Sequence, residues 1–209
     1  MASSPSQRLR RMAEKAARRK VVVAHKRKAE TALAAGHEAR QVAEAALAPV
    51  TACVMADGLF ADGMGSVILA RTMPSGLVGA SFFLLDAWCL GVKNAFFEVM
   101  TQSAFEEKLE ATERTQDLVD VDPQLARKLV EGAVAYAGSF GLAPHPDYDA
   151  ASVIFGDIIA TEQSFSFGKD GKPLFMSGPS DSRQRIRYIL DRLSKSVGPD
   201  GFDYMIAAN

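Results

Sequence analysis

Cysteine, histidine and long apolar runs are all scarce in this sequence. Its 209 residues include two cysteines, Cys53 and Cys89, and three histidines, all far apart in the chain. That spacing gives neither a CxxC pair nor a zinc-type ligand set, so we expect two buried thiols, no metal and no cofactor. No apolar run approaches the roughly 20 residues that cross a bilayer. We therefore expect a cytoplasmic protein with no membrane span.

The usual sequence signatures of catalysis are also missing. The chain contains no phosphate-binding loop, no dinucleotide fingerprint and no metalloprotease helix. His145 lies between two prolines, with Asp147 and Asp149 close behind, but no serine or cysteine nucleophile accompanies it. A rigid loop is the simpler interpretation of that segment. The pattern favours a protein that binds over one that catalyses, and it identifies no reaction.

Charge is present in quantity and is unevenly distributed. The formal net charge is -1, with 48% hydrophobic and 23% charged residues, as expected for a globular domain. Residues 1–28 nevertheless contain ten basic residues and one acid, a formal charge of +9, whereas the rest of the chain contains 14 bases and 24 acids, a formal charge of -10. The sequence therefore combines a basic arm with an acidic body.

The basic arm is predicted to be a long helix. Residues 8–35 contain no proline or glycine and are rich in Ala, Arg, Lys and Glu, which favour helix. Such a helix attracts nucleic acid, because phosphate binding releases condensed counterions. No aromatic residue lies among the bases, so contact would be with the phosphate backbone. The predicted contact residues are Arg8, Arg10, Arg11, Lys15, Arg18, Arg19, Lys20, Lys26, Arg27 and Lys28. Docking on the acidic body or on a protein partner, and a membrane or targeting role, are the alternatives.

Hydrophobic periodicity and turn residues predict an α+β fold in which antiparallel β-hairpins form a sheet covered by helices on one face. Predicted strands are residues 51–55, 66–72 and 77–85, a second hairpin of 161–167 and 172–177, and a last strand at 202–206. Predicted helices are residues 37–48, 86–99, 103–116, 123–140, 148–159 and 182–197. We expect the arm to comprise residues 1–48 and a single globular domain to comprise residues 49–209. A hairpin followed by a helix would then occur twice, which raised the idea of a duplication.

Three carboxylates, Asp57, Asp62 and Asp86, are the candidate catalytic residues. A strand ending in Asp-Gly, then Gly-x-Gly, a hairpin and a helix resembles the opening order of a ribonuclease H-like fold. That resemblance implies carboxylates that hold divalent ions for phosphodiester cleavage. The glutamate that the family places in the first helix is missing, since Lys93 and Asn94 stand there. The alternative is that the first two are turn residues and Asp86 is a cap.

A second candidate site precedes the helix at 182–197. Backbone N–H groups and hydroxyls at a helix start bind anions, and Gly178, Ser180, Ser182 and Arg183 are the residues predicted to do so here. Asp181 would compete for the same donors, so an ordinary capped helix is the alternative.

Together these features predict a non-enzymatic accessory protein. Its arm would contact nucleic acid or a ribonucleoprotein, and its body would dock on a partner or form a homo-oligomer. The alternatives are a metal-dependent nuclease of ribonuclease H-like topology and a structural subunit of a protein complex.

Overall fold

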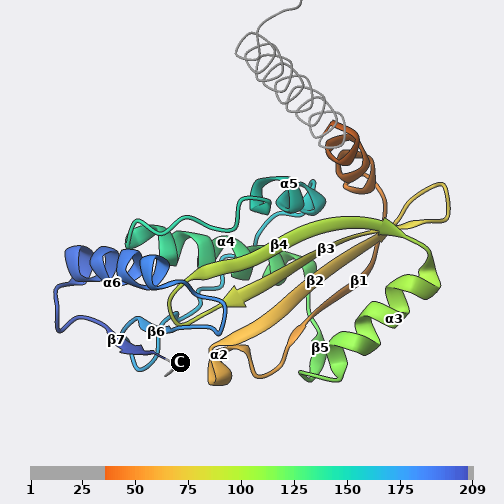
Figure 1. Ribbon diagram of the computed structural model, residues 1–209. Coiled ribbons are helices and arrows are strands. Elements are labelled where there is room, and N and C mark those ends of the chain that lie inside the picture. Colours follow the sequence, from red (N-terminus) through yellow and green to blue (C-terminus); the bar gives the residue numbers. More distant parts are fainter. Residues whose placement is uncertain (1–35, 207–209) are drawn as a thin grey trace, which may run out of the picture. The chain divides into compact units, whose positions relative to one another are not determined.

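The structure, a computed structural model, describes residues 36–206 and is built on a five-stranded antiparallel sheet (Figure 1). The chain divides into two units, Met1–Arg40 and Gln41–Asn209, and the second contains the sheet. The strands lie in the order β4-β3-β2-β1-β5. Their bounds are Val50–Ala56 for β1, Met64–Thr72 for β2, Val78–Asp86 for β3, Gly91–Met100 for β4 and Leu118–Asp120 for β5. The predicted α+β class is confirmed.

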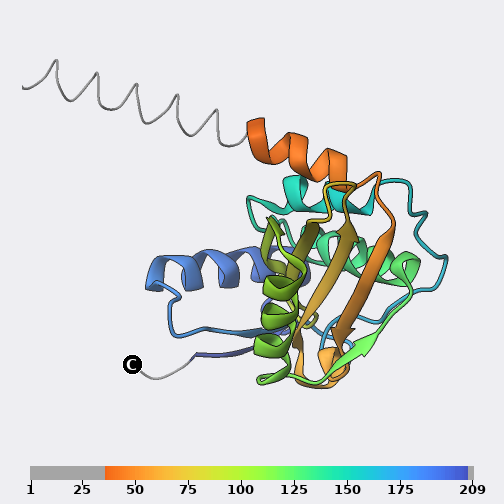
Figure 2. The same cartoon turned by 90° about the vertical axis from the view of Figure 1, so that its right-hand side faces the viewer.

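Helices cover both faces of this sheet, which corrects the expectation of one covered face (Figures 1 and 2). Helix α4 (Pro123–Ser139) and α5 (Tyr148–Ser152) pack on the face formed by residues such as Leu69 and Phe83. Helix α3 (Gln102–Glu113) packs on the other face through Phe105, against neighbours such as Ile68. Strands β2 and β3 lie in the interior of the sheet and are mostly buried. Alternate residues of a strand point to opposite faces, and because both faces are covered, these strands have apolar residues on both faces.

Strand β4 occupies the segment predicted to be a helix, and that prediction is wrong. Val92, Ala95, Phe96 and Val99 recur at helical spacing, which suggested one buried helical face. In the strand, Ala95 and Phe97 point into the α4 side, whereas Phe96 stacks on Phe82 with ring centroids 4.8 Å apart. A strand with apolar residues on both faces imitates helical spacing. The ribonuclease H-like opening order, which needs a helix here, is lost with it.

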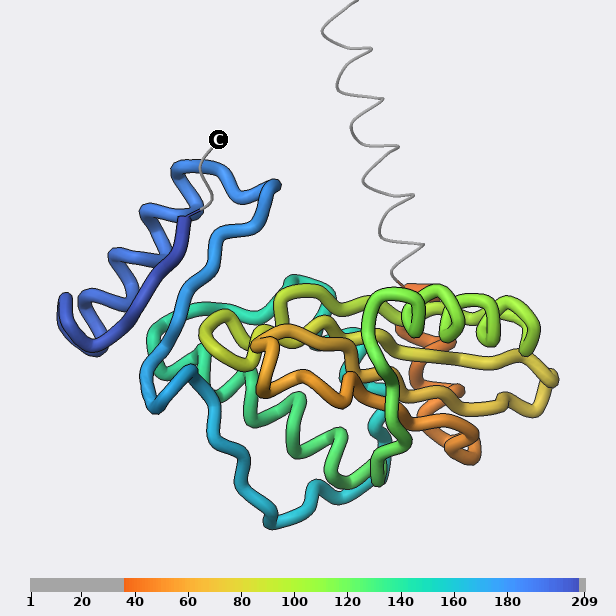
Figure 3. The backbone as a smooth tube through the Cα atoms, turned by 90° about the horizontal axis from the view of Figure 1, so that it is seen from below, coloured from red at the N-terminus to blue at the C-terminus, as the bar shows by residue number. Residues whose placement is uncertain are grey.

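A second, smaller core joins the end of α4 to α6 (Arg183–Val197) and to strand β6 (Leu174–Met176). The exposed strand β7 (Asp203–Met205) is attached to it by pairing with β6. Figure 3 shows α6 and β7 together to one side of the sheet. Strand β6 pairs with β7 in parallel, so the predicted hairpin of 161–167 with 172–177 does not form. Its central turn survives as a single bridge between Lys169 and Lys172. With neither second hairpin nor first helix present, the idea of a duplication is not supported.

Phe165 and Phe167 explain why residues 161–167 look like a strand. Their alternation with serine is real, but the two rings pack against the main core and stack on Phe60 and Tyr136, at 5.7 and 5.4 Å. The backbone next to these rings forms hydrogen bonds with other parts of the chain. Gly168, for example, donates its N–H to the carbonyl of Ala87. The segment is extended without a strand partner.

The remaining helices follow their predicted start and stop signals. Asp122 caps α4 by accepting the N–H of Gln124, and Pro123 occupies the first turn. Ser182 caps α6 in the same way, and the helix ends before Gly198. The helix predicted over 148–159 is shorter, because α5 passes into a 3-10 turn at Val153–Phe155. Short α2 (Leu59–Asp62) and a helix at 36–45 complete the described elements. Among the described residues, no helix combines the length and apolar character needed to cross a membrane.

Candidate functional site

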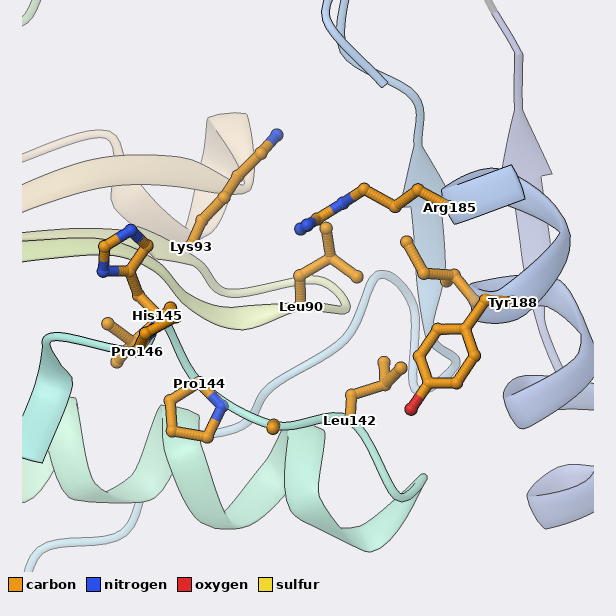
Figure 4. Close-up of a pocket in the computed structure, with 11 residues that line it drawn as sticks. Leu90, Lys93, Leu142, Pro144, His145, Pro146, Arg185 and Tyr188 are labelled. Carbon is orange, nitrogen blue, oxygen red and sulfur yellow. The ribbon is translucent and has the colours of Figure 1, made fainter. Parts of the chain in front are cut away.

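A pocket with basic side chains at its mouth lies between β4, the loop that follows α4, and α6 (Figure 4). Its cavity volume is about 190 Å³. Its lining residues are Leu90, Val92, Lys93, Leu142, Ala143, Pro144, His145, Pro146, Arg185, Tyr188 and Ile189. Three segments that are distant in sequence therefore meet around one small cavity.

Lys93 reaches this pocket because β4 carries a β-bulge. Leu84 pairs with Asn94 and Leu85 pairs with Val92, so Lys93 is the extra residue with no partner in β3. A bulge redirects the side chain that it carries, and bulges are frequent beside active sites. The ammonium extends toward the segment before α6, where Nζ lies 3.9 Å from the position that a Cβ on Gly178 would take. Within the described part of the chain, no carboxylate lies within 4.0 Å of it.

Arg185 approaches the pocket from the opposite side. Its Nε lies 3.1 Å from Oδ1 of Asp181, one helical turn earlier, and this ion pair fixes the direction of the side chain. Figure 4 shows the guanidinium extending over Leu90 toward the side where Lys93 lies. The Asp181 side chain is only 11% exposed and also accepts the N–H of Gly178 at 2.8 Å. Arg185 is therefore held in place and keeps its two terminal nitrogens for other partners.

His145 is positioned by the edge of the sheet. Its backbone N–H donates to the carbonyl of Val92 in β4 at 2.9 Å. Its Nδ1 accepts the N–H of Asp147 at 3.3 Å, which assigns the ring proton to Nε2. Pro144 and Pro146 on either side stiffen the loop. The imidazole therefore sits at the rim of the pocket as a hydrogen-bond donor.

The floor of the pocket is apolar and well buried. Leu90, Val92, Leu142 and Ile189 are each at most 6% exposed. Leu90 lies in a turn that Asp86 stabilises. The Oδ1 atom of Asp86 accepts the backbone N–H groups of Trp88 and Cys89 at 3.2 and 2.8 Å. The pocket thus joins a hydrocarbon floor to a rim of two cations and an imidazole.

The three predicted catalytic carboxylates do not assemble into a metal site. Asp57 and Asp62 are exposed, at the end of β1 and of α2, whereas Asp86 is buried and forms the turn just described. Among the residues that the structure describes, no three His, Cys, Asp or Glu side chains are grouped closely enough to hold a metal ion. Asp57, Asp62 and Asp86 therefore do not form such a group.

The predicted anion site before α6 lies beside the pocket but is differently organised. The Asp181 carboxylate accepts a hydrogen bond from the N–H of Gly178. The Ser182 hydroxyl accepts one from the N–H of Arg185 and caps the helix. Ser180 and Arg183 are exposed. Arg185, rather than Arg183, is directed toward the cavity. The ten predicted contact residues of the arm lie outside the described residues.

Lys93 and Tyr188 are polar lining residues that were assigned to no site from the sequence. Lys93 is the single charged residue between Asp86 and Glu98, in an otherwise apolar segment. That isolation was an available signal, but the bulge that directs the side chain has no signature in the sequence.

No family model matches this chain, and neither the curated proteins nor the solved structures include a significant match.

Proposed function

We propose that this protein is a non-enzymatic accessory protein that binds nucleic acid or a ribonucleoprotein through residues 1–28, the basic part of its N-terminal arm. The observation that carries the proposal is the segregation of charge, with +9 in the arm and -10 in the remainder. Contact with phosphates supplies affinity without sequence recognition and makes binding strongly salt-dependent. The acidic part of the body before α6, residues 41–182, would repel the same polymer, so it would remain available to a protein partner.

Helix α6 supports this proposal with a second basic surface. It contains five basic residues and one acid, whereas residues 41–182 contain 8 bases and 19 acids. All five basic side chains are exposed; they are Arg183, Arg185, Arg187, Arg192 and Lys195. Arg185 and Lys195 pair with Asp181 and Asp191. Arg183 and Arg187 have no carboxylate of the described chain within 4.0 Å, so they are available for phosphates.

The proposal is tested by fluorescence anisotropy with labelled single-stranded RNA and DNA between 50 and 200 mM salt, the range over which phosphate contacts weaken steeply. One variant replaces Arg8, Arg10, Arg11 and Lys15 by glutamine. The matched control exchanges arginine for lysine, and lysine for arginine, at the same four positions. Each lost phosphate contact should reduce the slope of log K against log salt by about 0.7 for single strands.

We expect the glutamine variant to bind more weakly with a shallower slope, and the charge-conserving control to bind like the parent. Absence of binding at 50 mM salt, or equal affinity of the glutamine variant, would contradict the proposal. Purification of the full chain with a bound protein that survives nuclease treatment would favour the structural-subunit alternative.

A further inference from the structure

We infer that the pocket between β4 and α6 is a binding site for a small monocarboxylate with an apolar body. The site is separate from the basic arm and does not depend on the proposed function. Its cavity volume of about 190 Å³ lies below the roughly 300–1,000 Å³ typical of drug-sized ligands. The ligand must therefore be a small molecule.

The charge at the pocket matches a single negative charge. Lys93 and Arg185 contribute two positive charges, and Asp181 neutralises one of them. Asp147, the carboxylate nearest to His145, does not line the cavity and is 65% exposed, so water screens it. The buried Asp86 carboxyl also interacts with Lys93, although it does not line the cavity. The pocket therefore has at most one uncompensated positive charge, which suits a carboxylate better than a phosphate monoester of about two charges.

The donors at the rim suit two carboxylate oxygens. The terminal nitrogens of Arg185 present parallel N–H groups, the arrangement that binds carboxylates in a fork geometry. The Lys93 ammonium offers three donors, and His145 offers Nε2–H as a further donor. The ion pair with Asp181 orients Arg185, whose side chain is 55% exposed, and the bulge sets the point at which Lys93 leaves the strand. Both reduce the conformational entropy lost on binding.

The floor selects the rest of the ligand. Leu90, Val92, Leu142 and Ile189 offer no polar side-chain atom, and the rings of Pro144 and Pro146 close one side. A hydrocarbon or aromatic body would displace water from that surface, whereas a polar body would lose hydrogen bonds there. A formate- or acetate-sized anion would leave the floor uncovered.

The experiment is an amide NMR titration of the full-length protein with four probes. Benzoate carries the charge and an apolar body, benzamide has nearly the same shape without the charge, acetate lacks the body, and phenyl phosphate carries the larger charge. Benzoate should bind saturably and shift amides near Val92, His145 and Ile189. Benzamide and acetate should each bind at least tenfold more weakly. Equal affinity of benzamide, or shifts confined to other regions, would overturn the inference, and tighter binding of phenyl phosphate would replace the carboxylate with a phosphate monoester.

Charge variants complete the test. Lys93→Met and Arg185→Met retain apolar stems and should each weaken benzoate binding at least tenfold. Arg187→Met is the matched control, since this exposed arginine lies two residues further along α6 and does not line the cavity. It should leave affinity unchanged, and an equal loss in this control would overturn the inference. Should one pocket variant fail to fold, the other carries the comparison, because Lys93 and Arg185 come from different elements.

Discussion

The buried guanidinium of Arg71 donates from Nε to the backbone carbonyl of Ile154 at 3.0 Å. Its other nitrogens donate to the carbonyls of Ala48 and Phe155, and the residue is 4% exposed. Ile154 and Phe155 lie in the 3-10 turn after α5, and Ala48 follows the helix at 36–45. Carbonyls at helix ends lack partners within the helix. One side chain of β2 therefore ties the 3-10 turn after α5 to the connection between the helix at 36–45 and β1.

Replacing Arg71 should be among the most destabilising substitutions in the body. Arg71→Met leaves the carbonyls of Ala48 and Ile154 without the donor they have here, whereas the carbonyl of Phe155 keeps the N–H of Ile158. Each buried unsatisfied group costs about 1–3 kcal/mol. We expect a loss of about 3 kcal/mol or more in the free energy of unfolding, measured by urea denaturation. Arg127→Met is the comparison, because Arg127 also donates to two backbone carbonyls but is 30% exposed, so water replaces it. Losses of equal size would show that burial is not the cause.

Gly63 should tolerate alanine poorly because of a steric clash, and Gly76 is the control that isolates the effect of this clash. Both glycines have a positive φ, 77° and 80°, which costs an alanine about 1–2 kcal/mol. A Cβ at Gly63 would also lie 2.1 Å from the Trp88 ring, whereas nothing lies within 4 Å at Gly76. Gly76→Ala should thus lose only the backbone term, and Gly63→Ala clearly more. Trp88, the single tryptophan, should report the clash as altered fluorescence in Gly63→Ala alone.

The two thiols should be almost inert in the folded protein. Burial, with smaller contributions from Asp122 and Asp120, raises the pKa of Cys53 to about 12. Burial, with a contribution from Asp86, also raises the pKa of Cys89. Since the thiolate is the reactive form, Ellman's reagent at pH 8 should modify the native protein at least a hundredfold more slowly than the protein in guanidinium. Rapid modification of either cysteine under native conditions would contradict the burial of these thiols.

Features of this fold that depend on neighbouring residues are readable from the sequence, and features that depend on tertiary contacts are not. Asp122, Pro123 and Ser182 act within one helical turn, so helix starts were predictable from neighbouring residues. Phe96 was misread because its role depends on Phe82 in another strand. The pocket is less predictable still. It needs the bulge at Lys93, the ion pair of Arg185 and the edge bond of His145, and each is fixed by contacts between distant segments.

Asp86 should give the fold a distinctive dependence on pH. Burial raises the pKa of this carboxyl above its ordinary value, although hydrogen bonds from the backbone of Cys89, Leu90 and Trp88 and the charge of Lys93 oppose the shift. The folded state then holds the proton more tightly than the unfolded state. This contribution to stability is therefore full below about pH 4 and declines as the pH rises to the native pKa of Asp86.

The variant Asp86→Asn should remove that decline. Asparagine keeps the oxygen that accepts the Trp88 and Cys89 bonds, so the turn survives. The substitution also alters the hydrogen bond from the backbone of Leu90. A cost in free energy that does not depend on pH shifts the whole curve of stability against pH and leaves its slope unchanged. Urea unfolding between pH 3 and pH 8 measures the free-energy difference between parent and variant. We expect the parent to lose stability relative to the variant above about pH 4 and then level off. A difference that does not change with pH would contradict the shift.

Lys93 should be coupled to Asp86, which links the pocket to the stability of the fold. The ammonium lowers the pKa of the buried carboxyl, in opposition to burial. Lys93→Met should raise that pKa further, so the decline in stability should continue to a higher pH than in the parent. Lys93→Arg conserves the charge and should preserve the parent profile. In the Asp86→Asn background, Lys93→Met should leave the pH profile unchanged, because the titrating partner is gone. If Lys93→Met still shifts the pH profile in the Asp86→Asn background, Lys93 acts on stability through another group. The turn formed by Asp86 would then be electrostatically independent of Lys93 at the rim of the pocket.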